Sequence, residues 1–225
     1  MKVSEIFKSI EGEGLRTGLA AVFVRLHGCN LRCSYCDSMY AVEGDDYKTM
    51  SVDEVIAAVE SYRDGSSVNS VTLTGGEPLL HQDVDELLAR LSKSGFLVNV
   101  ETNGTVPCKW QLPGLFYTMD WKCKSSGMSS KMKMENIETL GAQDALKFVV
   151  GSIEDLEEAE SVVVRLSQSK VANAMPHIFI SPVFGTLPYE RIVEWMLGSR
   201  AMTENNARFQ VQMHKIVWNP DMRGV

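Results

Sequence analysis

The sequence predicts an α/β fold: a single domain shaped as an incomplete, TIM-like barrel with a mostly parallel sheet. Strand-like apolar runs alternate with helix-like periodic segments along the chain, which is the pattern of βαβ units. Polar clusters follow several of these runs directly, where the carboxyl edge of a parallel sheet would gather them. The 225 residues fit one domain covering 1–225, and about six or seven strands are too few for a closed eight-stranded barrel.

The elements follow in order. The first predicted strand, residues 20–26, is a short apolar run that leads directly into a cysteine-rich loop. A helix then begins at Ser51, which has the capping-box spacing to Glu54 and is followed by aliphatic residues at helical spacing. Further strands are predicted at residues 71–74, 97–100, 116–119, 146–150, 177–180 and 208–212. Further helices are predicted at residues 84–91, 153–166 and 189–197, and residues 124–136 form a predicted loop or lid.

Composition narrows the function classes. Hydrophobic residues make up 44% and charged residues 23% of the chain, so it is a folded protein. The net charge of −7 lacks the basic field of a nucleic-acid binder, so no nucleic-acid partner is expected. No apolar run approaches the ~18 residues of a membrane span, and residues 1–5 lack the apolar segment of a signal peptide. We therefore expect a cytoplasmic protein with no membrane association.

Three of the five cysteines, Cys29, Cys33 and Cys36, fall within eight residues. Three interpretations compete. A disulfide framework does not suit a cytoplasmic chain with an odd cysteine count. A structural zinc site lacks an obvious fourth ligand, since Cys108 and Cys123 stand alone far along the chain. An iron–sulfur cluster on three cysteines would leave one iron free to bind a substrate or cofactor.

The run Cys29-Asn30-Leu31-Arg32-Cys33-Ser34-Tyr35-Cys36 resembles the signature of the radical S-adenosylmethionine enzymes. The resemblance implies a [4Fe-4S] cluster whose open iron is chelated by the methionine part of S-adenosylmethionine. It also implies that an electron from the cluster splits the sulfonium and yields a 5′-deoxyadenosyl radical.

Two further motifs match this family. Gly75-Gly76-Glu77-Pro78 looks like the loop that holds the methionine amino group, with Glu77 as an acceptor for the ammonium. Glu101-Thr102-Asn103-Gly104 follows the next predicted strand, although a simple Asn-Gly turn is an equal alternative from the residues alone. The expected cofactor-binding residues are Gly75, Gly76, Glu77, Glu101, Asn103 and, from the segment after residue 119, Lys122.

The two ends of the chain extend the resemblance. The opening Glu11-Gly12-Glu13-Gly14, the Gln212-Met213-His214-Lys215 segment and the Arg223-Gly224-Val225 tail are similar to the 7-carboxy-7-deazaguanine synthase family. That family converts 6-carboxy-5,6,7,8-tetrahydropterin to 7-carboxy-7-deazaguanine with release of ammonia, a step of queuosine and other 7-deazapurine biosynthesis. The resemblance implies a radical S-adenosylmethionine core with substrate-binding extensions at both ends.

The substrate residues implied by this resemblance are Glu11, Gly12, Glu13, Arg25, Gln212, His214 and Arg223. Ser38 matches the hydroxyl that meets Mg²⁺, a third cofactor, and a hard oxygen ligand suits that ion. Glu11 departs from the Gln of many members and Ser38 from their Thr. From the alternation alone, Gln210, Gln212 and His214 are expected on one face of the last strand.

The resemblance also implies a flavodoxin- or ferredoxin-like electron donor and a homodimer. Two other functions remain open from the sequence. A radical S-adenosylmethionine activase of a glycyl radical enzyme would carry the same cysteine spacing, and a zinc-stabilised binding module would be non-catalytic.

Overall fold

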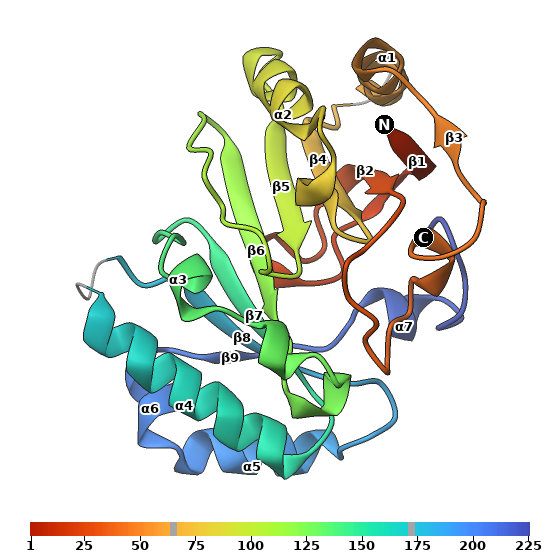
Figure 1. The fold of residues 1–225 in the computed structure, drawn as a ribbon. Helices are drawn as coiled ribbons and strands as arrows, with labels where there is room; N and C mark the ends of the chain where they lie inside the picture. Colours follow the sequence, from red (N-terminus) through yellow and green to blue (C-terminus); the bar gives the residue numbers. More distant parts are fainter. Residues whose placement is uncertain (64–66, 171–173) are drawn as a thin grey trace.

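A computed structural model describes residues 1–63, 67–170 and 174–225 of the chain. Its centre is one nine-stranded sheet in the order β3-β1-β2-β4-β5-β6-β7-β8-β9 (Figure 1). The strands from β2 to β9 in this order are parallel, and β1 pairs antiparallel with both β2 and β3. The sheet does not close on itself, since β3 and β9 are its edges. The predicted incomplete barrel is confirmed.

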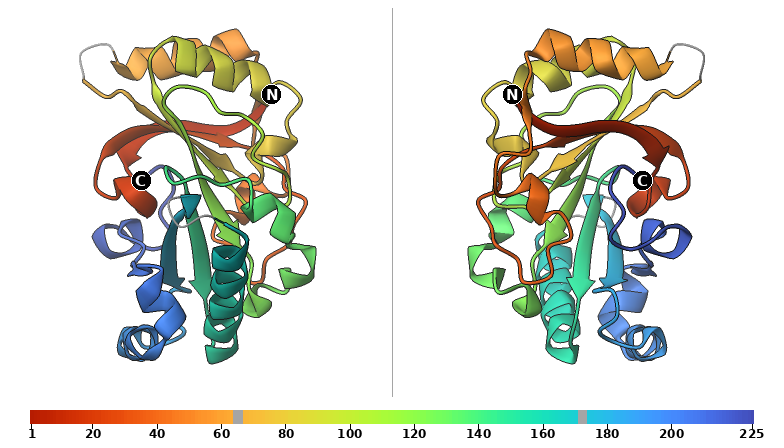
Figure 2. Two further views of the ribbon diagram at one scale, coloured as in Figure 1. Left: turned by 90° about the vertical axis from the view of Figure 1, so that its left-hand side faces the viewer. Right: turned by 90° about the vertical axis from the view of Figure 1, so that its right-hand side faces the viewer.

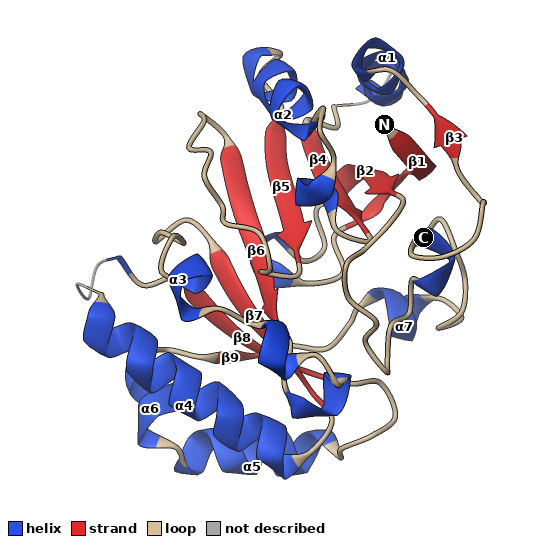
Figure 3. Cartoon of the chain, viewed as in Figure 1, coloured by secondary structure: helices blue, strands red, loops and turns tan. Residues whose placement is uncertain are grey.

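The strands are β1 Lys2–Ile10, β2 Ala20–Leu26, β3 Lys48–Thr49, β4 Ser70–Gly75, β5 Leu97–Thr102, β6 Leu115–Trp121, β7 Ala145–Val150, β8 His177–Pro182 and β9 Arg208–Phe209. The α-helices are α1 Val52–Arg63, α2 Val84–Lys93, α3 Met134–Ile137, α4 Ile153–Ser169, α5 Tyr189–Gly198, α6 Arg200–Glu204 and α7 His214–Val217. Figure 3 distinguishes the two classes by colour. No helix in the described ranges has the length and apolar character needed to cross a membrane.

The sheet curves, and its helices cover the outer, convex face. Helices α1 and α2 lie over one half of the sheet, and α4, α5 and α6 over the other (Figures 1 and 2). Each long helix buries one apolar stripe; in α2 the stripe is Val84, Leu87, Leu88 and Leu91. The inner face at the carboxyl ends of the strands is left for polar groups.

The predicted start of α1 is confirmed. Ser51 Oγ accepts a hydrogen bond from Glu54 N at 3.2 Å, and Glu54 Oε2 accepts from Ser51 N at 2.7 Å. These reciprocal bonds satisfy two backbone donors that the helix itself leaves unpaired.

Two strands were not predicted, β1 and the two-residue strand β3 at the sheet edge. Strand β1 precedes residues 20–26, so the cysteine loop follows the second strand in the chain, although that strand is the first of the parallel set. The sequence of β1 lacks strict alternation, since Ser4-Glu5 and Ile6-Phe7 place residues of like kind side by side. Most positions are only partly buried, because the strand pairs antiparallel near the sheet edge.

The prediction of a strand over 208–212 is wrong beyond Phe209. Gln210 N still donates to Ile180 O of β8 at 3.0 Å, but its side chain accepts from Gly14 N at 2.7 Å and donates to Thr17 Oγ1 at 2.6 Å. The chain leaves the sheet after this residue. His214 begins the short helix α7, so Gln210, Gln212 and His214 do not share a strand face. Side-chain bonds to the N-terminal loop replace the ladder that the alternation suggested.

The predicted lid, residues 124–136, is a series of short turns: η4 Lys124–Ser126, η5 Ser129–Lys131 and α3. It packs against the cysteine loop, since Ser34 N donates to Ser126 O at 3.0 Å. The segment therefore supports that loop.

Candidate active site

A cavity of about 730 Å³ lies at the carboxyl ends of the parallel strands. Its wall combines residues from both ends of the chain with the cysteine loop and the middle strands. The predicted site residues that line it are Gly12, Glu13, Arg25, Cys29, Cys33, Cys36, Ser38, Gly75, Gly76, Glu101, Asn103, Lys122, Gln212, His214 and Arg223. Glu11 and Glu77 do not line it.

The cysteine loop is held from the neighbouring strand. Asn103, just after β5, donates from Nδ2 to Cys29 Sγ at 3.5 Å and to Asn30 Oδ1 at 3.0 Å. Burial raises the pKa of Cys33 and of Cys36, so each thiol favours its protonated form until a metal replaces the proton. The side chain of Asn103 thus contacts the cysteine loop at two positions, Cys29 and Asn30.

The three cysteines of the loop are free thiols of intermediate burial, and all three line the cavity. Three thiolates on one short loop can hold an iron–sulfur cluster, and the cavity beside them leaves room for a ligand on the remaining iron.

The two glycines of the Gly75-Gly76 loop are needed for packing against the cysteine loop. A Cβ on Gly76 would lie 2.1 Å from Gly28 O and 2.9 Å from Cys29 Cβ. Gly75 has a φ of +138°, and a Cβ there would lie 2.0 Å from Leu26 O. The glycines bring β4 against the chain that enters the cysteine loop.

Glu77 is fully buried and faces the protein. Its carboxylate accepts from Asn103 N at 2.6 Å, Thr102 Oγ1 at 2.9 Å and Leu79 N at 3.0 Å. In this structure its oxygens hold the turn after β5, and the side chain does not line the cavity. The role of Glu77 as an ammonium acceptor stays a prediction.

Glu101 does reach the cavity, at the end of β5. Its Oε2 accepts from Thr74 Oγ1 at 2.7 Å. Burial raises the pKa of Glu101, and Lys147 opposes that shift.

A buried ion-pair network forms the cavity floor. Lys147 Nζ lies 2.8 Å from Glu13 Oε2 and 3.1 Å from Asp120 Oδ1, and Lys122 Nζ lies 2.9 Å from Asp120 Oδ2. Burial lowers the pKa of Lys147, but Asp120 and Glu13 outweigh it and raise the value, so this lysine stays charged. Two cations and two carboxylates thus fix each other across β6, β7 and the N-terminal loop.

Glu13 keeps one oxygen unused. Its side chain is 9% exposed, Oε2 bonds to Lys147 and to Gln212 Nε2 at 3.4 Å, and Oε1 is buried without a hydrogen-bond partner among the described residues. A buried acceptor of this kind is costly unless a ligand satisfies it. Glu13 therefore marks a position for a donor N–H or O–H in the cavity.

Arg25 and Ser38 also line the cavity and lie next to each other. Arg25 donates from Nε to Glu5 Oε1 at 2.7 Å, and its Nη1 lies 3.5 Å from Ser38 Oγ. Ser38 Oγ also donates to Asp37 Oδ1 at 3.0 Å, and Lys215 Nζ lies 3.0 Å from Asp37 Oδ2. Burial would raise the pKa of Asp37, but Lys215 and Ser38 outweigh it and lower the value to about 2.

Glu11 is buried beneath the cavity and accepts a hydrogen bond from Thr72 Oγ1. Burial, together with the nearby Glu101 carboxylate, raises its pKa from 4.5 to about 7. Glu11 is therefore about half protonated near neutral pH and lies outside the cavity.

Arg223 covers the rim. Its guanidinium carbon lies 3.7 Å from the centre of the Tyr40 ring, and Nη1 donates to Asp46 Oδ2 at 3.0 Å. The C-terminal segment is thereby tied to the loop that follows the cysteines.

Comparison with known proteins identifies the family. The Radical SAM superfamily model matches residues 23–110. The 7-carboxy-7-deazaguanine synthase of Clostridium acetobutylicum is 43% identical over all of this chain and 99% of its own length. That of Methanospirillum hungatei is 42% identical over 98% of this chain and 86% of its length. The chain belongs to the 7-carboxy-7-deazaguanine synthase family.

Solved structures agree on the fold. The crystal structure of QueE from Escherichia coli superimposes with a TM-score of 0.75, covers 95% of this chain and 94% of that one, and is 24% identical. Streptococcus suis SuiB bound to S-adenosylmethionine has a TM-score of 0.58 at 13% identity over 84% of this chain and 48% of that one.

Five charged residues that line the cavity were not predicted: Asp37, Asp120, Lys147, Lys215 and Asp221. Lys147 had a local signal, because it is a single charged residue within the buried apolar strand β7. Asp120 stands in the polar end of β6 beside the predicted Lys122. Their pairing joins residues far apart in sequence and follows from the sheet order.

Proposed function

We propose that this protein converts 6-carboxy-5,6,7,8-tetrahydropterin to 7-carboxy-7-deazaguanine with release of ammonia; its relatives are named 7-carboxy-7-deazaguanine synthases. The observation that carries the proposal is that one cavity is lined both by the three cysteines and by Glu13. The cavity holds three thiols at one wall and, at its floor, the unpartnered buried oxygen of Glu13. A pterin is rich in N–H donors, which this carboxylate can accept.

The cofactor side is the wall that carries Cys29, Cys33 and Cys36, which would hold a [4Fe-4S] cluster. When bound, the cluster and S-adenosylmethionine supply the radical that removes a hydrogen from the substrate. Residues of neighbouring strand ends would hold the S-adenosylmethionine. We assign this role to the backbone of Gly75 and Gly76 and to the side chains of Glu101, Asn103 and Lys122.

The substrate side is built from the N- and C-terminal extensions of the core. Glu13 would accept from the pterin ring, with Gln212 and His214 beside it. Gly12 permits this arrangement, since a Cβ there would lie 2.4 Å from His214 Nδ1. Arg25 is charged and half-buried at the cavity wall, where it suits the substrate carboxylate.

Magnesium would bind at Ser38. Its hydroxyl and the Asp37 carboxylate, with a pKa of about 2, form a hard oxygen set at the cavity wall. The substrate and water would supply the other ligands. Glu11 is assigned to the support of the floor and not to contact with the substrate.

Two partners belong to the proposal. A flavodoxin- or ferredoxin-like protein would donate the electron near the exposed part of the cysteine loop.

A homodimer would cover some of the exposed apolar side chains, of which Leu197 and Ile216 are 74% and 62% exposed. The rate of cluster reduction by such an electron donor tests the first partner, and sedimentation, which measures the oligomeric state, tests the second.

The test is anaerobic incubation of the reconstituted protein with the tetrahydropterin, S-adenosylmethionine, Mg²⁺ and a reductant. We expect the deazapurine product and ammonia in equal amounts. No product from fully clustered protein would contradict the proposal, and a colourless protein with zinc and no iron would support a binding module instead.

A further inference from the structure

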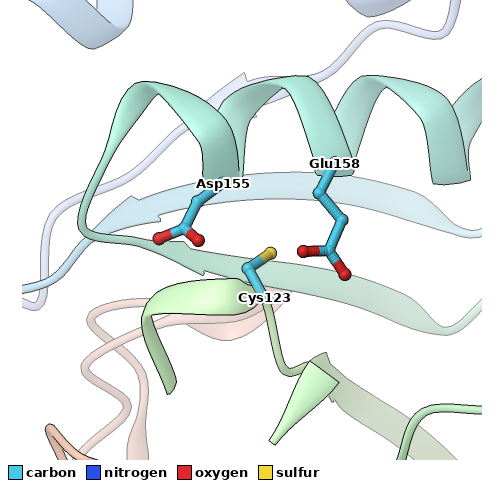
Figure 4. A group of neighbouring side chains, drawn as sticks. All are labelled: Cys123, Asp155 and Glu158. Atoms are coloured by element: carbon cyan, nitrogen blue, oxygen red, sulfur yellow. The ribbon is translucent and has the colours of Figure 1, made fainter. Parts of the chain in front are cut away.

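Helix α4 begins with a group of side chains that looks like a metal site. Cys123 Sγ and carboxylate oxygens of Asp155 and Glu158 lie within 4.8 Å of one another (Figure 4). Asp155 is fully buried. The hydrogen bonds of the two carboxylates show a different use for the group.

Each carboxylate oxygen in this group has an N–H donor. Asp155 Oδ1 accepts from Ser125 N at 2.9 Å, and its Oδ2 accepts from Gly151 N at 2.8 Å. Glu158 Oε2 accepts from Lys124 N at 3.0 Å, and its Oε1 accepts from the Trp121 indole at 3.1 Å. The group is therefore an acceptor set that fastens the chain after β6 to the first turns of α4.

The segment fastened in this way supports the cysteine loop. Ser34 stands between Cys33 and Cys36, and its Oγ donates to Ser125 O at 2.5 Å while its N donates to Ser126 O at 3.0 Å. The η4 turn is itself closed by a bond from Ser126 Oγ to Cys123 O at 2.5 Å. A continuous path of hydrogen bonds thus runs from α4 through η4 to the backbone between two cysteines.

We propose that Asp155 is a positioning residue for the iron–sulfur cluster. By accepting from Ser125 and Gly151 at once, it fixes η4 against the end of β7. The η4 turn in turn fixes Ser34, and with it the directions of Cys33 and Cys36. This inference rests on one part of the proposed function, namely that Cys33 and Cys36 are ligands of the cluster.

The physical reason is that both oxygens of Asp155 must accept. An asparagine keeps the size but presents an NH₂ group to one of the two backbone N–H donors, so one bond becomes a repulsion. Outer residues that orient metal ligands affect metal affinity by roughly 10- to 100-fold when changed. Their hydrogen bonding and packing also tune the reduction potential of iron–sulfur clusters.

The chain offers a matched control. Asp144 is also buried and accepts two backbone N–H groups, from Tyr117 at 2.9 Å and from Gly141 at 2.7 Å. It lies next to the start of β7, whereas Asp155 follows the end of that strand. Asp144→Asn therefore imposes the same chemical defect at the opposite end of the sheet from the cysteine loop.

The experiment compares reconstituted wild type, Asp155→Asn and Asp144→Asn. The rate at which a chelator removes iron and the midpoint potential of the cluster are measured together with the melting temperature. We expect both variants to melt earlier, but iron loss to rise roughly 10-fold or more in Asp155→Asn alone, with a shifted potential. Equal iron loss in both variants, or wild-type behaviour of Asp155→Asn, would overturn the inference.

A second variant covers the case in which Asp155→Asn does not fold. Ser34→Ala removes the Oγ bond to Ser125 and leaves the buried carboxylate intact. It is expected to lose iron faster than wild type at an unchanged melting temperature, and unchanged iron loss would contradict the proposed path. Wild-type protein that takes up no cluster would instead refute the proposed function, so the two failures are distinguishable.

Discussion

Glu13 brings one negative charge to the cavity floor and leaves one oxygen for a ligand. Replacing it by glutamine keeps the shape but weakens a charge-assisted hydrogen bond of about 1.5–3 kcal/mol. We predict that Glu13→Gln raises the KM for the tetrahydropterin roughly 10- to 100-fold, while binding of S-adenosylmethionine changes little. Steady-state kinetics and a cofactor titration measure both, with the exposed Glu190→Gln as the control. An unchanged KM would exclude a direct contact.

The raised pKa of Glu11 makes the free energy of unfolding depend on pH. Its pKa is raised in the folded protein, so between pH 4.5 and about 7 the unfolded chain releases the proton that the folded protein keeps. Stability is therefore lost as the pH rises through this window, by about 3 kcal/mol at most.

Glu11→Gln removes this titration and can still accept from Thr72. We predict that it melts several degrees above wild type at pH 8 and that the difference shrinks toward pH 5. Melting curves across this range test it, with the exposed Glu157→Gln as the control. A difference independent of pH would show that Glu11 does not titrate there.

The motif residues could be predicted because each motif is local. The three cysteines, Gly75-Gly76 and the residues after β5 carry their pattern within a few positions. The unused oxygen of Glu13 could not be predicted, since it depends on Lys147, which is 134 positions away. The same limit applies to Glu77: the motif is local, but the direction of its side chain depends on Thr102 and Asn103 at the end of β5.

At the scale of elements, the contact between the end of β4 and the start of the cysteine loop leaves no room for a side chain at Gly76. A methyl group on Gly76 would overlap Gly28 O, which is backbone and cannot rotate away. We predict that Gly76→Ala retains less than half of the wild-type iron after reconstitution. Gly198→Ala is the matched control, because a Cβ at that position meets nothing within 4 Å. Equal iron content in the two variants would refute the prediction.

The parallel strands were predictable because a buried strand is a nearly continuous apolar run, as in β7, where Lys147 is the one interruption. Strand β1 was missed because its sequence is neither a continuous apolar run nor a strict alternation, and because it pairs near the sheet edge. The end of β9 was misplaced because the alternation from Arg208 to Gln212 is typical of a strand, while the Gln210 side chain bonds to the N-terminal loop instead. Side-chain bonds between distant segments have no periodic signature.

At the scale of the whole molecule, one part of the cavity wall comes from the middle strands of the sheet, and the other part comes from the N- and C-terminal segments of the chain. Gln210 joins the ends through Gly14 N, Gly14 O and Thr17 Oγ1. We predict that Gln210→Ala raises the KM for the pterin roughly 10-fold, from lost neutral hydrogen bonds of about 1 kcal/mol each, and leaves S-adenosylmethionine affinity unchanged. Equal losses for both ligands would contradict a divided cavity.

The bonds between Gln210 and Gly14 also bear on how the molecule assembles. They connect residues 196 positions apart, so closing them costs the chain entropy of a very long loop. Contacts between consecutive strands and helices close far shorter loops and can form earlier. The half of the cavity assigned to the cofactor can therefore fold first, and the half assigned to the pterin is completed when the chain ends meet, which makes it the last part of the protein to mature.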